Sequence, residues 1–249
     1  MTPEATTLPP HPTLSPYYGQ AEEKRKFLQR IFDDTAADYD RMDYLASFGT
    51  GPWYRGQALQ RAGLAAGMKV LDVAVGTGLV AREEIKLVGD PKLVTGLDPS
   101  MGMMQLAVQQ LGIRAILGVG ESLPISSDQF DFLSMGYALR HLADLRVTFK
   151  EFHRVLKPGG RVLILEISRP ANVVHRTLLR TYMKGIMPLI SRMIGRRADT
   201  QKLWAYYWET IEQCVPADQV LEALTAAGFT DVKRYCEWGM FSEFTATKA

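Results

Sequence analysis

Two acidic residues near a glycine turn are the residues of this chain best suited to holding a ligand. Asp72 precedes the turn formed by Gly76, Thr77 and Gly78, and Asp98 ends a second apolar run about twenty residues later. Glycine lets the backbone approach a ligand closely because it has no Cβ. A carboxylate beside such a turn accepts hydrogen bonds from ribose hydroxyls, so this spacing indicates a nucleoside site.

A doubly wound α/β sheet is the fold that brings these residues together. Residues 70–75 and 93–97 are typical of short buried strands, and the glycine break at 76–78 is typical of a tight turn before a helix. The carboxyl ends of adjacent parallel strands meet at one edge of such a sheet. We therefore expect the turn and Asp98 to lie side by side at that edge.

The glycine spacing fits two classes of cofactor. Gly76, Gly78 and Ala81 with an acid near position 98 also match the fingerprint of a dinucleotide site, so an NAD-dependent oxidoreductase is one alternative. Asp72 favours the other class, because its charge would repel a nearby pyrophosphate at a cost on the order of several kcal/mol. The same charge would attract the ammonium of S-adenosylmethionine, directly or through water. The simplest alternative is that Asp72 only caps the turn.

Later segments continue the loop-and-strand pattern in a fixed order. The segments that carry a resemblance are 72–78, Asp98, 121–124, Phe130-Asp131 and 156–160. In this order, over about residues 68–168, they resemble the successive motifs of class I S-adenosylmethionine-dependent methyltransferases. The resemblance implies a Rossmann-like doubly wound sheet that is mostly parallel, with an antiparallel C-terminal strand, and S-adenosylmethionine as the cofactor.

A narrower resemblance runs from about residue 30 to the C-terminus as a succession of short matches. These matches lie at 31–32, 39–43, 47–49, 139–140, 165–170 and 227–229. They resemble the ubiquinone/menaquinone biosynthesis C-methyltransferases, which methylate a ring carbon of a prenylated benzoquinol or naphthoquinol. The resemblance implies an enzyme of quinone biosynthesis whose acceptor is a lipophilic quinol.

Several positions depart from that family pattern. Val119 and Gly120 stand where the family has Asn-Ala, His141 where it has Asn, Gly136 where it has a hydroxyl, and Gly51 where it has His. These changes leave the methyl donor in place and keep two other hypotheses open. One is an O- or N-methyltransferase of a specialised small-molecule metabolite, and the other is a non-catalytic S-adenosylmethionine-binding module.

His141 and Arg140 are the predicted catalytic residues. A ring carbon becomes a good nucleophile when the adjacent hydroxyl loses its proton, and a histidine with an ordinary pKa of about 6.5 can take that proton. Arg140 would stabilise the resulting phenolate with a fixed positive charge. The alternatives are that His141 is a helix-capping or surface residue and that Arg140 pairs with a core acid such as Glu166.

The predicted cofactor-binding residues cluster in the same motifs. They are Asp72, Gly76, Thr77, Gly78, Asp98, Met103, Val119, Gly120, Glu121, Gly136 and Tyr39. Glu121 either lies near the adenine or caps the following turn, and Tyr39 either contacts a ligand or packs in the core. No metal site is expected, because Cys214 and Cys236 lack the spacing of metal ligands.

Length and composition fit one globular domain. The chain has 249 residues, 47% of them hydrophobic, and we expect residues 21–249 to form a single methyltransferase domain with a helical cap at about 22–64. Residues 1–20 hold five prolines and are predicted to be a disordered arm. The net charge of +2 argues against general binding to nucleic acid. The cytoplasm is the expected location.

Residues 170–213 are predicted to be a helical lid insertion. From Arg169 to Lys202 there are eight basic residues and one acid, which gives a charge of +7. One interpretation is a lid with a core face and a solvated basic face. The other is a Met-rich wall for a greasy acceptor, with basic residues that contact the inner face of an anionic membrane. A homodimer is left open.

Overall fold

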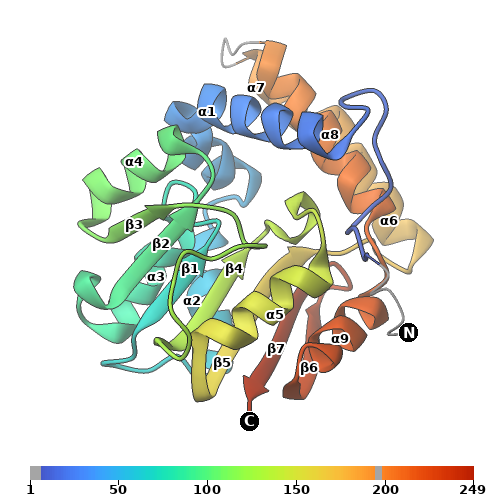
Figure 1. Cartoon of the computed structure of the whole chain (residues 1–249). Coiled ribbons are helices and arrows are strands. Elements are labelled where there is room, and N and C mark those ends of the chain that lie inside the picture. Colours follow the sequence, from blue (N-terminus) through green and yellow to red (C-terminus); the bar gives the residue numbers. More distant parts are fainter. Residues whose placement is uncertain (1–6, 194–197) are drawn as a thin grey trace.

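A single mixed sheet forms the centre of the molecule. The structure, a computed structural model, describes residues 7–193 and 198–249 (Figure 1). Within those residues, seven strands lie in the order β3-β2-β1-β4-β5-β7-β6, and only the pairs made by β7 are antiparallel. The strands are β1 (Val70–Val73), β2 (Val94–Asp98), β3 (Arg114–Leu117), β4 (Phe130–Gly136), β5 (Leu156–Ile167), β6 (Phe229–Glu237) and β7 (Phe241–Lys248). The predicted fold class is confirmed.

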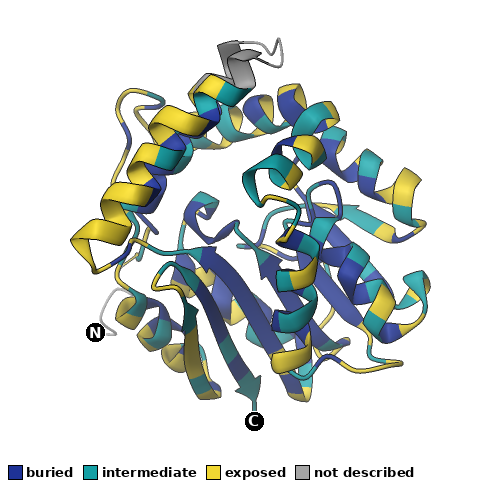
Figure 2. Ribbon diagram, turned by 180° about the vertical axis from the view of Figure 1, so that it is seen from behind, coloured by how far each residue is buried: buried dark blue, intermediate teal, exposed yellow. Residues whose placement is uncertain are grey.

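Helices cover both faces of the sheet because its central strands alternate apolar side chains to either side. Val70 and Phe132 pack in one core with α2 (Gly51–Arg61), α3 (Leu79–Val88) and α4 (Met101–Leu111). Leu71 and Leu133 pack in the other with α5 (Leu145–Val155) and α9 (Ala217–Ala226). Figure 2 shows the central strands of the sheet as deeply buried.

A layer of helices crosses the carboxyl end of the parallel strands, at the top of Figure 1. It consists of α1 (Ala21–Ala46), α6 (Val173–Thr181), a π-helical segment (Tyr182–Ile186), α7 (Met187–Met193) and α8 (Ala198–Gln213). Met183 and Trp208 of the insertion pack against Ile31 and Met42 of α1 in one buried cluster. The predicted helical lid is therefore confirmed. The predicted cap is α1 alone, since α2 packs on α3 at a face of the sheet.

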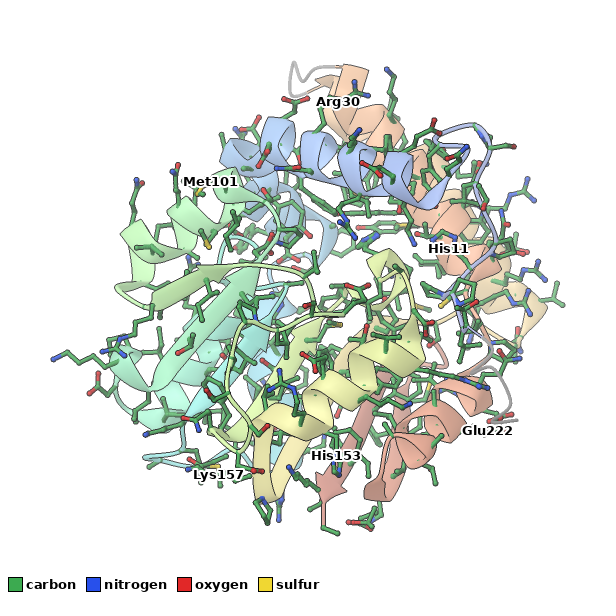
Figure 3. All side chains as sticks on the ribbon, in the orientation of Figure 1. His11, Arg30, Met101, His153, Lys157 and Glu222 are labelled. Carbon is green, nitrogen blue, oxygen red and sulfur yellow. The ribbon has the colours of Figure 1, made fainter. Side chains whose placement is uncertain are left out.

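The N-terminal segment is ordered by contacts with the rest of the fold. Leu14 and Tyr18 are buried, and His11, labelled in Figure 3, is only 4% exposed. The carbonyl of Leu8 accepts a hydrogen bond of 3.0 Å from the N–H of Leu145, the first residue of α5. That N–H has no partner inside its own helix, so the segment supplies one. The prediction of a disordered arm is wrong for residues 7–20, and residues 1–6 lie outside the described part.

Side-chain caps fix the loops at the ligand end. Ser100 precedes α4 and accepts a hydrogen bond of 3.2 Å from the N–H of Met103. Asp144 precedes α5 and accepts one of 2.8 Å from the N–H of Arg146. Such caps typically stabilise a helix by about 1 kcal/mol. None of the described helices combines the length and the apolar character that a membrane crossing requires.

Candidate functional site

A cavity of about 430 Å³ lies between the carboxyl edge of the sheet and helix α1. The residues that follow β1, β2 and β4 form its floor, and α1 and the segment 141–143 form its walls. Its volume suits a small organic ligand. Most of the predicted site residues that line it come from the loops at that edge, where parallel strands of a doubly wound sheet hold ligands.

The glycine turn forms one side of this cavity. Gly76 and Gly78 have φ of 56° and 91°, in the left-handed region that glycine adopts without strain. A Cβ on Gly78 would also lie 2.5 Å from Leu111 Cδ1, so only glycine lets α3 and α4 pack this closely. Gly76 and Thr77 line the cavity, whereas Gly78 caps α3 behind them. The Thr77 hydroxyl is buried and has no partner among the described residues.

Asp98 lies beside the glycine turn, as predicted. Its carboxylate accepts hydrogen bonds of 2.8 Å from the N–H groups of Gly76 and Ser100. Burial raises the pKa of Asp98 to about 6, and those two hydrogen bonds oppose the rise. The same carboxylate lines the cavity, where its remaining lone pairs can accept from ligand hydroxyls.

The loop after β3 forms the opposite wall. Val119, Gly120 and Glu121 all line the cavity, and Met103 of α4 lies with them. Glu121 also accepts a hydrogen bond from the backbone N–H of Ala143. Glu121 therefore lines the cavity and ties the loop after β3 to the segment after β4, rather than capping the turn that follows it, and its place near the adenine stays a prediction.

Gly136 and Tyr39 also line the cavity. A Cβ on Gly136 would lie 2.6 Å from Val80 Cγ2, so α3 packs closely against this glycine. Burial raises the pKa of Tyr39, and its hydroxyl receives a hydrogen bond of 3.4 Å from the Tyr207 hydroxyl.

Asp72 is placed differently from the prediction. It is fully buried, and it is not among the described residues that line the cavity. The strand alternation turns its side chain toward α3, where it accepts a hydrogen bond of 3.2 Å from Ser134. Ser134 also donates to Glu84, and burial together with the Glu84 charge raises the pKa of Asp72. Asp72 therefore has no direct contact with the cavity, but its second oxygen, Oδ2, is buried without a partner among the described residues, so the contact through water stays a prediction.

His141 lines the cavity. Its Nδ1 lies 3.2 Å from the Tyr206 hydroxyl, and its ring stacks on that of Tyr206 with centroids 5.6 Å apart. Burial is the main cause that holds the pKa of His141 well below its ordinary value, with the charges of Arg140 and Lys24 adding to it. The imidazole is therefore neutral at neutral pH, and a Nδ1–H that donates to Tyr206 would leave Nε2 as an acceptor.

Arg140 does not reach the cavity. Its guanidinium forms an ion pair with Glu166, and both side chains are about 97% buried or more, with exposures of 3% and 2%. Arg140 also lies over the Tyr207 ring, 5.6 Å from its centroid. The pair with Glu166, left open as an alternative above, is the arrangement found. Arg140 thus adjoins His141 in the chain without lining the cavity. Contrary to the prediction, its guanidinium has no direct contact with the space that a phenolate would occupy.

Several charged residues that the sequence reasoning missed also line the cavity, among them Lys24, Asp43 and Arg55. Lys24 of α1 donates a hydrogen bond of 2.8 Å to the carbonyl of Leu142, and burial lowers its pKa to about 8. Asp43 and Arg55 form an ion pair at another part of the wall. The local signal for Asp43 was its place in the matched segment 39–43, but Arg55 had no local signal at all.

The family model that matches the chain is the ubiE/COQ5 methyltransferase family, over residues 19–248. The chain belongs to the ubiE/COQ5 methyltransferase family. Among its relatives, demethylmenaquinone methyltransferase of Geobacillus stearothermophilus is 32% identical over 220 residues, which is 86% of this chain and 92% of that one. The ubiquinone/menaquinone biosynthesis C-methyltransferase of Shewanella sediminis is 32% identical over 221 residues, 86% of this chain and 87% of that one.

Solved structures agree with this fold. A S-adenosylmethionine-dependent methyltransferase of Thermotoga maritima has a TM-score of 0.63 at 20% identity, covering 89% of this chain and all of that one. One of Methanococcus maripaludis has a TM-score of 0.64 at 17% identity, covering 88% and 94%. The [4+2]-cyclase SpnF also matches, with a TM-score of 0.63 at 16% identity, covering 90% and 96%. The fold is thus that of class I methyltransferases, and the fold alone does not fix the reaction.

This methyltransferase uses S-adenosylmethionine as its methyl donor, and the cavity fits that molecule. The buried Thr77 hydroxyl without a partner and the Asp98 carboxylate beside the glycine turn are polar groups placed for a nucleoside. The described residues contain no cluster of three or more His, Cys, Asp or Glu that could hold a metal ion. The expectation of a metal-free enzyme stays a prediction.

Proposed function

We propose that this methyltransferase transfers a methyl group to a ring carbon of a quinol in prenylquinone biosynthesis. Its relatives carry the names demethylmenaquinone methyltransferase and ubiquinone/menaquinone biosynthesis C-methyltransferase. The single observation that supports the proposal is one continuous cavity lined by Asp98 at the sheet edge and by His141 under the cap. The aromatic residues Phe32 and Tyr39 line the same cavity and suit a flat ring.

Asp98 would accept hydrogen bonds from the ribose hydroxyls, and the backbone of Gly76 and Thr77 would follow the nucleoside. Val119 has no polar side chain, so adenine recognition falls to backbone groups near Gly120 and to Glu121. Met103 would supply an apolar contact, and Gly136, which has no side chain, would leave room for the ligand. Gly78 and Asp72 would act from behind the wall, by holding the turn and the strand in place.

Methyl transfer from a sulfonium is an in-line displacement, so the chain contributes mainly by aligning the two reactants. The bound donor supplies the electrophilic methyl group. His141 would take the proton of the phenolic hydroxyl at Nε2, since its imidazole is neutral, although the burial and positive charges that lower its pKa also make it a weaker base. Tyr206 would orient that imidazole through Nδ1, and the Arg140–Glu166 pair would hold the segment that carries it.

The proposal is tested with labelled S-adenosylmethionine and extracted cellular lipids, followed by identification of the labelled product. A methyl group on a ring carbon of a prenylated quinol supports the proposal. A methyl group on oxygen or nitrogen of another metabolite would instead support the second candidate function. The observation that favours this second candidate is the change at Val119 and His141 from the family pattern. Binding without turnover on any acceptor would point to the non-catalytic module.

We also propose that the lid lies against an anionic membrane, at the inner face from which a lipophilic acceptor is collected. The outer face of α6 and α7 exposes apolar side chains, and Figure 2 shows this face as largely exposed. The exposed apolar residues are Val173, Val174, Leu178, Ile186 and Leu189. Arg180 and Lys184 are exposed nearby. The side chains of Arg192, Arg196 and Arg197, which belong to the basic count, lie outside the described part.

Sedimentation with vesicles tests this second step. Vesicles of phosphatidylglycerol should retain the protein and vesicles of phosphatidylcholine should not, because each basic residue near an anionic surface contributes about 1 kcal/mol. Leu178→Glu should reduce retention, and equal retention of that variant would remove α6 from the contact. The homodimer and the cytoplasmic location remain proposals of the same kind, and sedimentation equilibrium checks the first of them.

A further inference from the structure

The charged pair formed by Arg55 and Asp43 is the part of the cavity wall that the proposed function leaves unexplained. Arg55 is 3% exposed, although it comes from α2, a helix on the face of the sheet. One of its guanidinium nitrogens, Nη2, donates to the carboxylate of Asp43. Its Nε and Nη1 are buried and have no hydrogen-bond partner in the described part of the chain.

Buried donors without partners are uncommon in folded proteins, and each costs about 1–3 kcal/mol. None of the described residues provides an acceptor for them. Both Arg55 and Asp43 are among the residues that line the cavity, so the pair borders the space that a ligand would occupy. The guanidinium also lies 5.8 Å from the centre of the Tyr137 ring, which limits its freedom to turn away.

The absence of a side chain at Gly51 gives the guanidinium of Arg55 its room. A Cβ at that position would lie 2.7 Å from Arg55 Nη1 and 3.3 Å from Asp43 Oδ2. This chain has glycine there, where the resembled family has histidine. The guanidinium therefore occupies room that a larger residue at position 51 would take.

We propose that Arg55 and Asp43 together hold the amino-acid end of S-adenosylmethionine. The guanidinium donates to the carboxylate of that end, and Asp43 accepts from its ammonium. A guanidinium is the side chain best suited to a carboxylate, and an adjacent acid completes the match to a zwitterion. The inference rests on the proposed use of S-adenosylmethionine, and it assigns to Asp43 the direct ammonium contact that Asp72 is not placed to make.

Calorimetric titration with two nucleosides tests this assignment. S-adenosylhomocysteine carries the amino-acid end, and 5′-methylthioadenosine lacks it. Arg55→Gln should weaken binding of S-adenosylhomocysteine about 10- to 100-fold while changing that of 5′-methylthioadenosine by about twofold or less. Arg82→Gln is the matched control, because Arg82 pairs with Asp40 on the surface and does not line the cavity. It should change neither affinity.

Two further variants keep the test decisive if Arg55→Gln folds poorly. Arg55→Lys should retain part of the affinity for S-adenosylhomocysteine, because the charge remains. Asp43→Asn should weaken binding of S-adenosylhomocysteine but not binding of its analogue that lacks the amino group. Equal losses for both nucleosides, or no loss for either, would overturn the inference. If the wild-type protein does not bind S-adenosylhomocysteine, the donor site itself is disproved. If the variants behave as expected but the methylated product is not a quinol, only the proposed acceptor is disproved.

Discussion

The sheet edge and the helical cap make the two walls of one cavity by different means. At the sheet edge, the contacts come from a glycine turn, backbone N–H groups and the short side chain of Asp98, all within about thirty residues of the sequence. At the cap, Lys24 and Tyr39 come from α1, His141 comes from the segment after β4, and His141 is held by Tyr206 of the distant insertion. The edge is therefore formed by residues close together in the sequence, and the cap by residues far apart in the sequence.

The difference separates binding from chemistry. Short loops after parallel strands have little freedom, so they hold a nucleoside in one position whatever acceptor the enzyme uses. The cap packs through methionine and aromatic side chains, which adapt more readily to ligands of different shape. Apart from Asp43, the residue of α1 proposed to bind the donor, we therefore expect substitutions at the edge to change affinity for the donor and substitutions at the cap to change turnover.

The largest effect is expected for His141→Ala. Removing the group proposed to take the phenolic proton should lower kcat by roughly 100- to 10,000-fold. The affinity for S-adenosylhomocysteine should stay the same, since the donor is held at the edge. Steady-state kinetics and calorimetry measure the two quantities. Tyr206→Phe is the milder comparison, because it only removes the partner of Nδ1. Wild-type rates in His141→Ala would exclude His141 from the mechanism.

Asp98 and Asp72 offer a sharper comparison within the edge. Both are buried acids on adjacent strands, but only Asp98 lines the cavity. Asp98→Ala should weaken binding of S-adenosylhomocysteine by about 1–3 kcal/mol through lost charge-assisted hydrogen bonds. Asp72→Asn should change it by about twofold or less. A larger loss in the Asp72 variant would mean that the ligand lies deeper than the cavity floor.

Donor affinity should also depend on pH through Asp98. Burial raises the pKa of this carboxyl to about 6, and the ionised form is the one that accepts from ribose. Affinity should therefore be constant above about pH 7 and fall by up to tenfold for each pH unit below about 6. Titration of S-adenosylhomocysteine across this range checks the slope. The same slope in Asp98→Asn would assign the dependence to another group.

The smallest effect is expected for the thermal stability of the protein, through the buried acid Glu84 of α3. Burial raises the pKa of Glu84 from its ordinary 4.5 to about 7. A raised pKa in the folded state means that the acid's contribution to stability is full below about pH 4.5 and is lost as pH rises through about 7. Glu84→Gln should therefore raise Tm by a few degrees near pH 8, since each kcal/mol is worth about 2–4 °C at this size.

Thermal unfolding near pH 8 and near pH 5 measures that difference, which should shrink at the lower pH. Glu83→Gln serves as the control, because Glu83 is also a buried acid of α3 but forms an ion pair with Lys86. A gain for Glu84→Gln that is the same at both pH values would show that charge is not its cause.

Residues 70–98 allowed much of the edge to be predicted, because strand, turn and acid follow one another in sequence. The same reasoning placed Asp72 in the cavity, since spacing along the strand does not reveal which face its side chain takes at the turn. It treated residues 1–20 as an arm, because prolines suggest disorder when the partners of their neighbours are unknown. Arg55 was missed, since nothing local indicates that a residue of α2 reaches the ligand.

The sequence by itself determined the α/β sheet, the glycine turn beside Asp98 and the helical lid, because hydrophobic periodicity and turn residues act over short distances. Only the tertiary structure decided that Asp72 faces Glu84, that Arg140 pairs with Glu166 and that Arg55 meets Asp43 at the cavity. Each of these depends on which elements pack together. Burial then sets the charge and the available partners of every such group.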